Sequence, residues 1–173
     1  MAKEYTLGFG KANLYAFIIS VPIIVILLIL FSVIWSYDIY VSGIDTLVDY
    51  YYVFFAGILI HEVLHLAGWA LFVSKGIKSF RIGIKLKYLT PYCHVKEPLK
   101  VKYYRYGIAL PLVILGIIPS LYGIFTGDGT VFTFGLLFTL VAGGDIIILI
   151  WLINLDNESC VLDHPDKMGF TKL

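Results

Sequence analysis

The chain has 173 residues, of which 60% are hydrophobic and only 14% are charged, and its mean hydropathy is +0.89. This composition is far too apolar for an ordinary soluble domain and indicates an integral membrane protein. The formal net charge is only +1. We therefore expect the lipid bilayer, and no nucleic acid, as a partner.

Four apolar stretches are long enough to cross the roughly 30 Å of a membrane's hydrocarbon core. They cover residues 14–35, 47–72, 104–125 and 131–154. The sequence predicts an all-α membrane protein with four transmembrane helices, built as a single domain over residues 1–173. A short β-hairpin is expected on the cytoplasmic side, between the second and third helices.

The first stretch, residues 14–35, contains no ionisable side chain and has Pro22 as its one irregularity. It is longer than the apolar region of a typical signal peptide. We therefore expect a retained membrane anchor with a structural role.

The second stretch contains the pentapeptide HEVLH, which places His61, Glu62 and His65 inside a predicted membrane span. Residues four apart lie on one face of a helix, so the two imidazoles can bind one zinc ion, and Glu62 can act as general base on a nearby water. Alternatively, these side chains are polar groups satisfied by neighbouring helices. Ionisable groups at membrane depth are rare and usually functional, which favours the metal site.

The connection after the second stretch has a different pattern. Residues 80–87 alternate between apolar and basic or small side chains, Thr90-Pro91 predicts a turn, and residues 92–96 can return as a second strand. The nine basic residues between Lys75 and Arg105 can contact water or anionic lipid head groups. Alternatively, an edge of this hairpin receives an extended peptide substrate by strand addition.

The third stretch contains Pro111 and Pro119, which predict a kinked helix. The fourth contains two glycines followed by Asp145. At 1.5 Å per residue, Asp145 and His65 both lie roughly 11–14 Å from the cytoplasmic edge. Because a catalytic zinc usually has three protein ligands, Asp145 is the candidate third ligand. The alternatives are that Asp145 is a packing acid and that His94, in the hairpin, is the third ligand.

The basic residues indicate the orientation of the chain. Lys and Arg occur only within residues 3–11, 75–105 and 167–172, which four crossings would place on one side. The positive-inside bias makes that side cytoplasmic. We expect a multi-pass protein of a prokaryotic plasma membrane with both termini in the cytoplasm.

The remaining polar features have plain interpretations. Cys93 and Cys160 are both expected on the cytoplasmic side, where thiols stay reduced, so a disulfide is not expected. The tail of residues 156–173 is polar, and His164 is expected to be a surface residue.

These motifs resemble the site-2 protease group of intramembrane zinc proteases. They resemble more closely the small membrane family named putative zincin peptidases. The resemblance rests on HEVLH, on Lys96-Glu97-Pro98, on the proline-containing third stretch and on Gly-Gly-Asp145. It implies that His61 and His65 bind zinc, that Glu62 is the catalytic base and that an intramembrane aspartate is the third ligand.

The expected function is therefore an intramembrane zinc metalloprotease that cleaves membrane-embedded or membrane-associated protein substrates. Zinc would activate a water and Glu62 would take its proton. Water must reach the site, so we expect a polar cavity open to the cytoplasm between the second, third and fourth spans. The alternatives are a zinc-dependent hydrolase of lipids or lipidated substrates, an inactive zinc-binding scaffold and an ion transporter.

Overall fold

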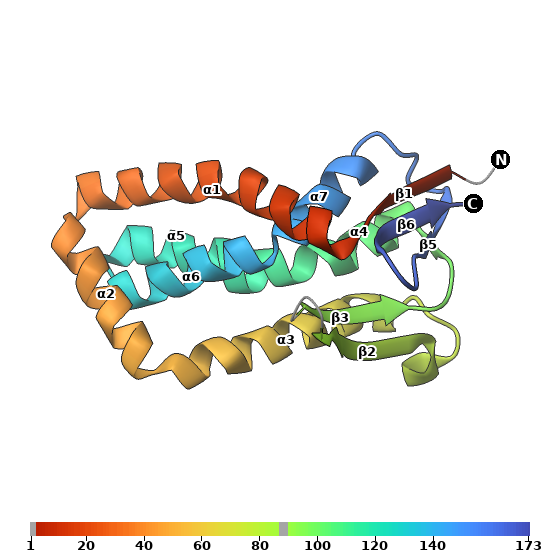
Figure 1. The fold of residues 1–173 in the computed structure, drawn as a ribbon, viewed down its shortest axis with the longest axis horizontal. Helices are drawn as coiled ribbons and strands as arrows, with labels where there is room; N and C mark the ends of the chain where they lie inside the picture. Colours follow the sequence, from red (N-terminus) through yellow and green to blue (C-terminus); the bar gives the residue numbers. More distant parts are fainter. Residues whose placement is uncertain (1–2, 87–89) are drawn as a thin grey trace.

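A computed structural model describes residues 3–86 and 90–173. The molecule is elongated, with helices along most of its length and the described strands at one end (Figure 1). The first strand, β1 (Lys3–Leu7), pairs antiparallel with the last, β6 (Met168–Lys172). The two chain ends therefore lie side by side at the strand end of the molecule.

The first half of the chain forms α1 (Phe9–Ile34), α2 (Tyr37–Asp49) and α3 (Tyr51–Ala70). The second half forms α4 (Val101–Pro111), α5 (Ile118–Thr126), α6 (Gly129–Val141) and α7 (Gly143–Leu152). Among the described residues, three helical runs are long and apolar enough to cross a membrane, or four if the bent pair α6 and α7 is one span. This is compatible with a multi-pass membrane protein.

The first two predicted spans have different bounds from those expected. Helix α1 starts at Phe9, before residue 14, and the stretch 47–72 runs across a break at Tyr50 that separates α2 from α3. Helix α2 was not predicted, because its acidic residues suggested a connecting loop. It packs tightly on α6: a Cβ on Gly43 would lie 2.2 Å from the carbonyl carbon of Gly129.

The third predicted span is one continuous helical run from Val101 to Thr126. The expected irregularity takes the form of a π-helical segment, η3 (Leu112–Ile117), between α4 and α5. Pro111 ends α4, and Pro119 lies in the first turn of α5, where a missing N–H is tolerated.

The fourth predicted span, residues 131–154, is broken rather than continuous. Helices α6 and α7 meet at Ala142 with a bend of 57°. Two consecutive glycines weaken the helix there, and a Cβ on Gly143 would lie 2.8 Å from both Ala16 Cβ and Ser20 Oγ of α1. The break places Asp145 in the first turn of α7, where the helix dipole stabilises a negative charge.

The predicted hairpin is present as β2 (Phe80–Lys85) and β3 (Thr90–Val95), which pair antiparallel. The expected turn at Thr90-Pro91 is wrong, because Thr90 pairs with Lys85 and Pro91 with Ile84 inside the strands. The strands are therefore joined through residues 86–89, of which 87–89 lie outside the described residues.

A second sheet corrects the prediction of an all-α fold with a simple polar tail. Its four strands have the order β1-β6-β5-β4, where β4 is Leu99–Lys100 and β5 is Cys160–Asp163. Val161 and Phe170 from the tail are fully buried in one cluster with Trp69 of α3 and Tyr104 of α4. This cluster joins the sheet to the helical bundle. Both cysteines are free, as expected.

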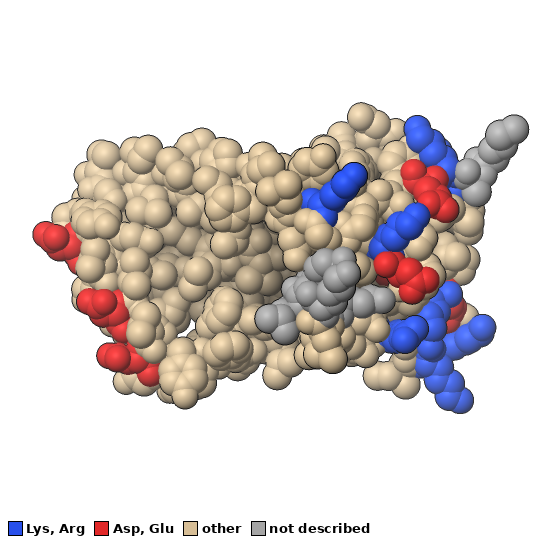
Figure 2. All heavy atoms as spheres, in the orientation of Figure 1, with Lys and Arg blue, Asp and Glu red and all other residues tan. Residues whose placement is uncertain are grey.

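Charged side chains are unevenly distributed along the molecule. In Figure 2 the visible Lys and Arg side chains gather at the strand end, whereas the opposite end shows only acidic ones. Helix α2, at that opposite end, carries Asp38, Asp45 and Asp49. On the face drawn in Figure 2, the helical part between the two ends carries mostly uncharged side chains.

Candidate metal centre and active-site cavity

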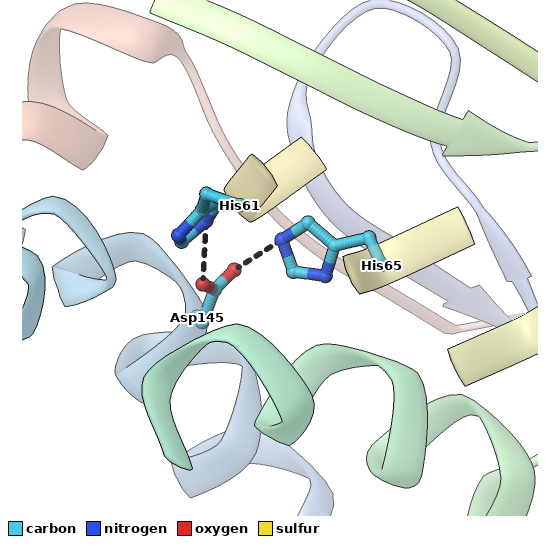
Figure 3. Close-up of side chains that lie close together, drawn as sticks. All are labelled: His61, His65 and Asp145. Carbon is cyan, nitrogen blue, oxygen red and sulfur yellow. Dashed lines mark ion pairs between the residues drawn. The ribbon is translucent and has the colours of Figure 1, made fainter. Parts of the chain in front are cut away.

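Three side chains from two helices form a compact group in the interior. His61 and His65 lie on consecutive turns of α3, and Asp145 reaches them from the first turn of α7 (Figure 3). His61 Nε2 lies 3.2 Å from Asp145 Oδ2, and His65 Nε2 lies 3.4 Å from Asp145 Oδ1. Each of the three residues is at most 8% exposed. Helix positions that are 80 residues apart in the chain thus converge on one point.

The orientation of His65 is fixed by helix α4. His65 Nδ1 lies 2.9 Å from the carbonyl oxygen of Gly107, which can only accept a hydrogen bond, so Nδ1 donates. The two helices approach closely here, since a Cβ on Gly68 would lie 2.6 Å from Gly107 Cα. A neutral imidazole that donates from Nδ1 has its lone pair on Nε2, which is the nitrogen that faces Asp145. This is the usual arrangement of a metal-binding histidine.

The donor set fits a zinc ion. One ligand atom from each of the three residues lies within 4.8 Å of the other two, which is close enough for the three atoms to meet one ion. Among the described residues, Asp145 Oδ2 and His61 Nδ1 are buried without a hydrogen-bond partner. Asp145 Oδ2 faces His61 Nε2, and a buried carboxylate facing an imidazole is costly unless a proton or a metal ion lies between them. The group could therefore hold a metal ion through His61, His65 and Asp145.

Glu62 lies beside this group, between α3 and the hairpin. Its carboxylate accepts a hydrogen bond from the backbone N–H of Cys93 in β3. The oxygen Oε2 is buried and has no hydrogen-bond partner among the described residues. Glu62 is therefore held by one oxygen and keeps the other available for a water molecule.

A cavity of about 470 Å³ opens over these four side chains. The cavity was expected between the second, third and fourth predicted spans. This expectation was incomplete, because α1 also forms a wall of the cavity, with Ala12, Asn13, Ala16 and Phe17. Strand β3, Ile108 of α4 and the loop between β5 and β6 complete it. Helix α1 was expected to be purely structural, since its sequence carries no ionisable group along the span.

A second polar group lines the same cavity. His94 of β3 is buried, and its Nδ1 lies 2.8 Å from Asp163 Oδ2 at the end of β5. The same carboxylate accepts hydrogen bonds from the Val95 N–H and the Tyr104 hydroxyl, at 3.2 and 2.8 Å. His94 is thus buried and lies outside the group that could hold a metal ion.

The edge of β3 that faces the cavity offers few donors. The register of the hairpin and the bond from Lys96 N to Ser79 O direct the backbone of Pro91, Cys93 and Val95 away from β2. Proline has no N–H, and the other two amides donate to Glu62 and Asp163. Along the described part of this edge, a peptide therefore meets carbonyl acceptors.

Sequence reasoning located part of this site. It identified His61, Glu62, His65 and Asp145, which the structure brings to one cavity. It missed Asp163 and Tyr104, since nothing in the local sequence distinguishes Asp163 from the other acids of the tail. It also placed His164 on the surface. His164 lines the cavity, and its Nδ1 accepts from the backbone N–H groups of Asp166 and Lys167.

The comparisons with known proteins agree with a metallopeptidase. Residues 54–160 match the model of the family DUF3267, which is described as putative zincin peptidase. This segment is more than half of the chain and contains both HEVLH and Asp145. The search of curated proteins and the search of solved structures found no match. The chain therefore belongs to the putative zincin peptidase family.

Proposed function

We propose that this protein is an intramembrane zinc metallopeptidase. The observation that carries the proposal is the buried group of His61, His65 and Asp145, with the unpartnered oxygen of Glu62 beside it in one cavity. A purely structural zinc site needs no base, and a closed site needs no cavity. This arrangement therefore supports hydrolysis over an inactive scaffold.

The residues have separate roles in this proposal. His61, His65 and Asp145 hold the zinc ion, which supplies Lewis acidity towards a water and a carbonyl group. Glu62 takes a proton from the attacking water and passes it to the leaving amine. The Cys93 N–H keeps the carboxylate of Glu62 in place. Gly107 keeps the metal-binding nitrogen of His65 directed at the site.

The proposed substrates are membrane-embedded or membrane-associated proteins. The apolar surfaces of α1 and α3 support an intramembrane location, and the cavity between them reaches Ile58, Leu140 and Val141, in the apolar helical part. The paired terminal strands and the gathered basic residues support cytoplasmic termini. An unwound substrate segment could donate its N–H groups to the carbonyls on the outer edge of β3.

One experiment tests this proposal directly. Zinc-loaded protein in detergent is incubated with fluorescein-labelled casein and with bacterial inner-membrane vesicles, and new protein N-termini are identified by mass spectrometry. We expect cleavage by the wild type and by Glu158→Gln, a change at an exposed surface ion pair. Glu62→Gln should retain zinc and cleave nothing, because an amide cannot accept the proton. Equal products from wild type and Glu62→Gln would refute the proposal.

A zinc-dependent hydrolase of lipids or lipidated substrates is the second candidate. The observation that favours it is the outer edge of β3, where the described amides of Cys93 and Val95 already donate within the protein. A lipid ester needs no strand partner. Lipid analysis of the same vesicles separates the two functions: fatty acids released only with intact Glu62, and no new protein N-termini, would favour the lipid hydrolase.

A further inference from the structure

We propose that His94 is a catalytic residue that donates a hydrogen bond from Nε2 to the oxygen on which negative charge develops during hydrolysis. Asp163 and Tyr104 are positioning residues that hold it. This inference rests on the proposed function, and it assigns a role to a polar cluster outside the metal-binding group.

The imidazole of His94 has a fixed orientation. Asp163 Oδ2 lies 2.8 Å from His94 Nδ1, so Nδ1 donates to the carboxylate and Nε2 is the ring nitrogen left for a ligand. When both ring nitrogens carry a proton, Nε2 can donate to an oxyanion while Nδ1 stays bonded to Asp163. His94 lines the same cavity as His61, Glu62 and His65.

The carboxylate of Asp163 is held rigidly by its neighbours. Asp163 accepts three hydrogen bonds, from the His94 ring, the Val95 amide and the Tyr104 hydroxyl. Tyr104 is fully buried. An exposed surface ion pair would have no such support. A fixed donor acts on a transition state more strongly than a mobile one, because it needs no reorganisation during the reaction.

Stacked aromatic rings connect this cluster to the candidate metal-binding group. The His65 ring stacks on Trp69 with centroids 5.4 Å apart, and Trp69 stacks on Tyr104 at 5.5 Å. Trp69 Nε1 also donates to the Tyr104 carbonyl oxygen. The candidate zinc ligand and the residue that holds Asp163 thus belong to one packed column.

Strand β3 links His94 to Glu62. The amide of Cys93 contacts the Glu62 carboxylate, and His94 is the next residue, about 3.3 Å further along the strand. Glu62 and His94 line the same cavity, so the proposal places the attacked carbonyl between them. Zinc on one side and an imidazolium on the other would share the developing charge.

The test uses a capped dipeptide phosphonamidate, whose tetrahedral anionic group resembles the transition state of amide hydrolysis. Its affinity for the zinc-loaded protein is measured by calorimetry, and zinc affinity is measured separately by competition with a chromophoric chelator. We expect His94→Ala to weaken phosphonamidate binding about 100-fold, the usual effect of removing one such donor, with zinc affinity unchanged.

Two further variants make the test independent of folding defects. His94→Gln keeps a donor for Asp163, so it should melt like the wild type and still bind the phosphonamidate weakly. Tyr104→Phe removes only the hydroxyl that holds Asp163, and should weaken binding by about tenfold. Tyr106→Phe is its matched control, because Tyr106 is 53% exposed, and it should have no effect.

The outcomes distinguish this inference from the proposed function. Unchanged phosphonamidate affinity in a folded, zinc-loaded His94→Gln would overturn the inference, as would loss of zinc, which would make His94 a ligand. If Glu62-dependent hydrolysis is present in the wild type, either result leaves the proposed function standing. Absence of that hydrolysis would refute the proposed function itself, whatever the His94 variants do.

Discussion

Two pairs of helices in this molecule make contact through different kinds of group, one through backbone atoms and the other through polar side chains. Between α5 and α6 the backbones approach so closely that a Cβ on Gly135 would lie 2.4 Å from the Ser120 amide nitrogen. Helices α3 and α7 instead face each other through His61, His65 and Asp145, with separations of 3.2 and 3.4 Å between lone-pair atoms. The first pair is complementary with protein atoms alone, and the second presents a buried group that could hold a metal ion.

This difference separates an interface built by close packing from one that could hold a metal ion. Helices in a bilayer associate through small residues that let backbones touch, and the α5–α6 pair meets that requirement. Unpaired buried polar groups destabilise a fold unless they serve another purpose. The α3–α7 pair is therefore the place where changes should alter metal content before they alter packing.

The largest expected effect is the loss of zinc from His61→Ala. One of two imidazoles on the same helix face disappears, and the two remaining ligands bind zinc weakly. Metal analysis should find about one zinc per wild-type chain and almost none in the variant. His164→Ala is the matched control, since His164 lines the same cavity outside the metal-binding group, and it should retain zinc.

A smaller effect is expected at the packed interface. Gly135→Ala forces a methyl group against the backbone of Ser120 and should destabilise the protein by roughly 1–3 kcal/mol, as overpacking does. Gly144→Ala is the control, because a Cβ there would meet nothing within 4 Å. Thermal denaturation in detergent should show a lower Tm for Gly135→Ala alone. Equal Tm values would mean that α5 and α6 are not closely packed.

The smallest expected effect concerns the thiol of Cys93, which lies beside Glu62. Burial, and next the carboxylates of Glu62 and Asp163, raise the pKa of Cys93 to about 12. At pH 8 about 10⁻⁴ of this thiol is ionised, so iodoacetamide should label it slowly. Removing a nearby negative charge lowers the pKa and increases the thiolate fraction. Mass spectrometry should therefore find faster labelling of Cys93 in Glu62→Gln and an unchanged rate in Glu158→Gln.

The local sequence predicted the features that depend on short-range pattern. Apolar length indicated the helical spans, and the four-residue spacing of HEVLH placed His61 and His65 on one face. Asp145 was found because an acid inside an apolar stretch is unusual. The alternation of residues 80–87 indicated the hairpin, although Pro91 was mistaken for part of the turn.

Features that depend on long-range contacts could not be predicted in this way. Asp163 acts on His94 across 69 residues, and β1 pairs with β6 at the other end of the chain. The bend at Ala142 depends on Gly143 packing against α1. Helix α1 forms a wall of the cavity because it packs against α7 in this way. Its sequence could not predict this role, since it shows only a long apolar stretch.

The affinity of Asp145→Asn for zinc tests the central claim most directly. Competition with a chromophoric chelator at neutral pH should show one site in the wild type, and an affinity at least about tenfold weaker in the variant, because an amide oxygen is a neutral and poorer donor. Circular dichroism should show the same helix content in both proteins. Equal zinc affinity in a folded Asp145→Asn would contradict the proposal that α3 and α7 are held together by a shared metal ion.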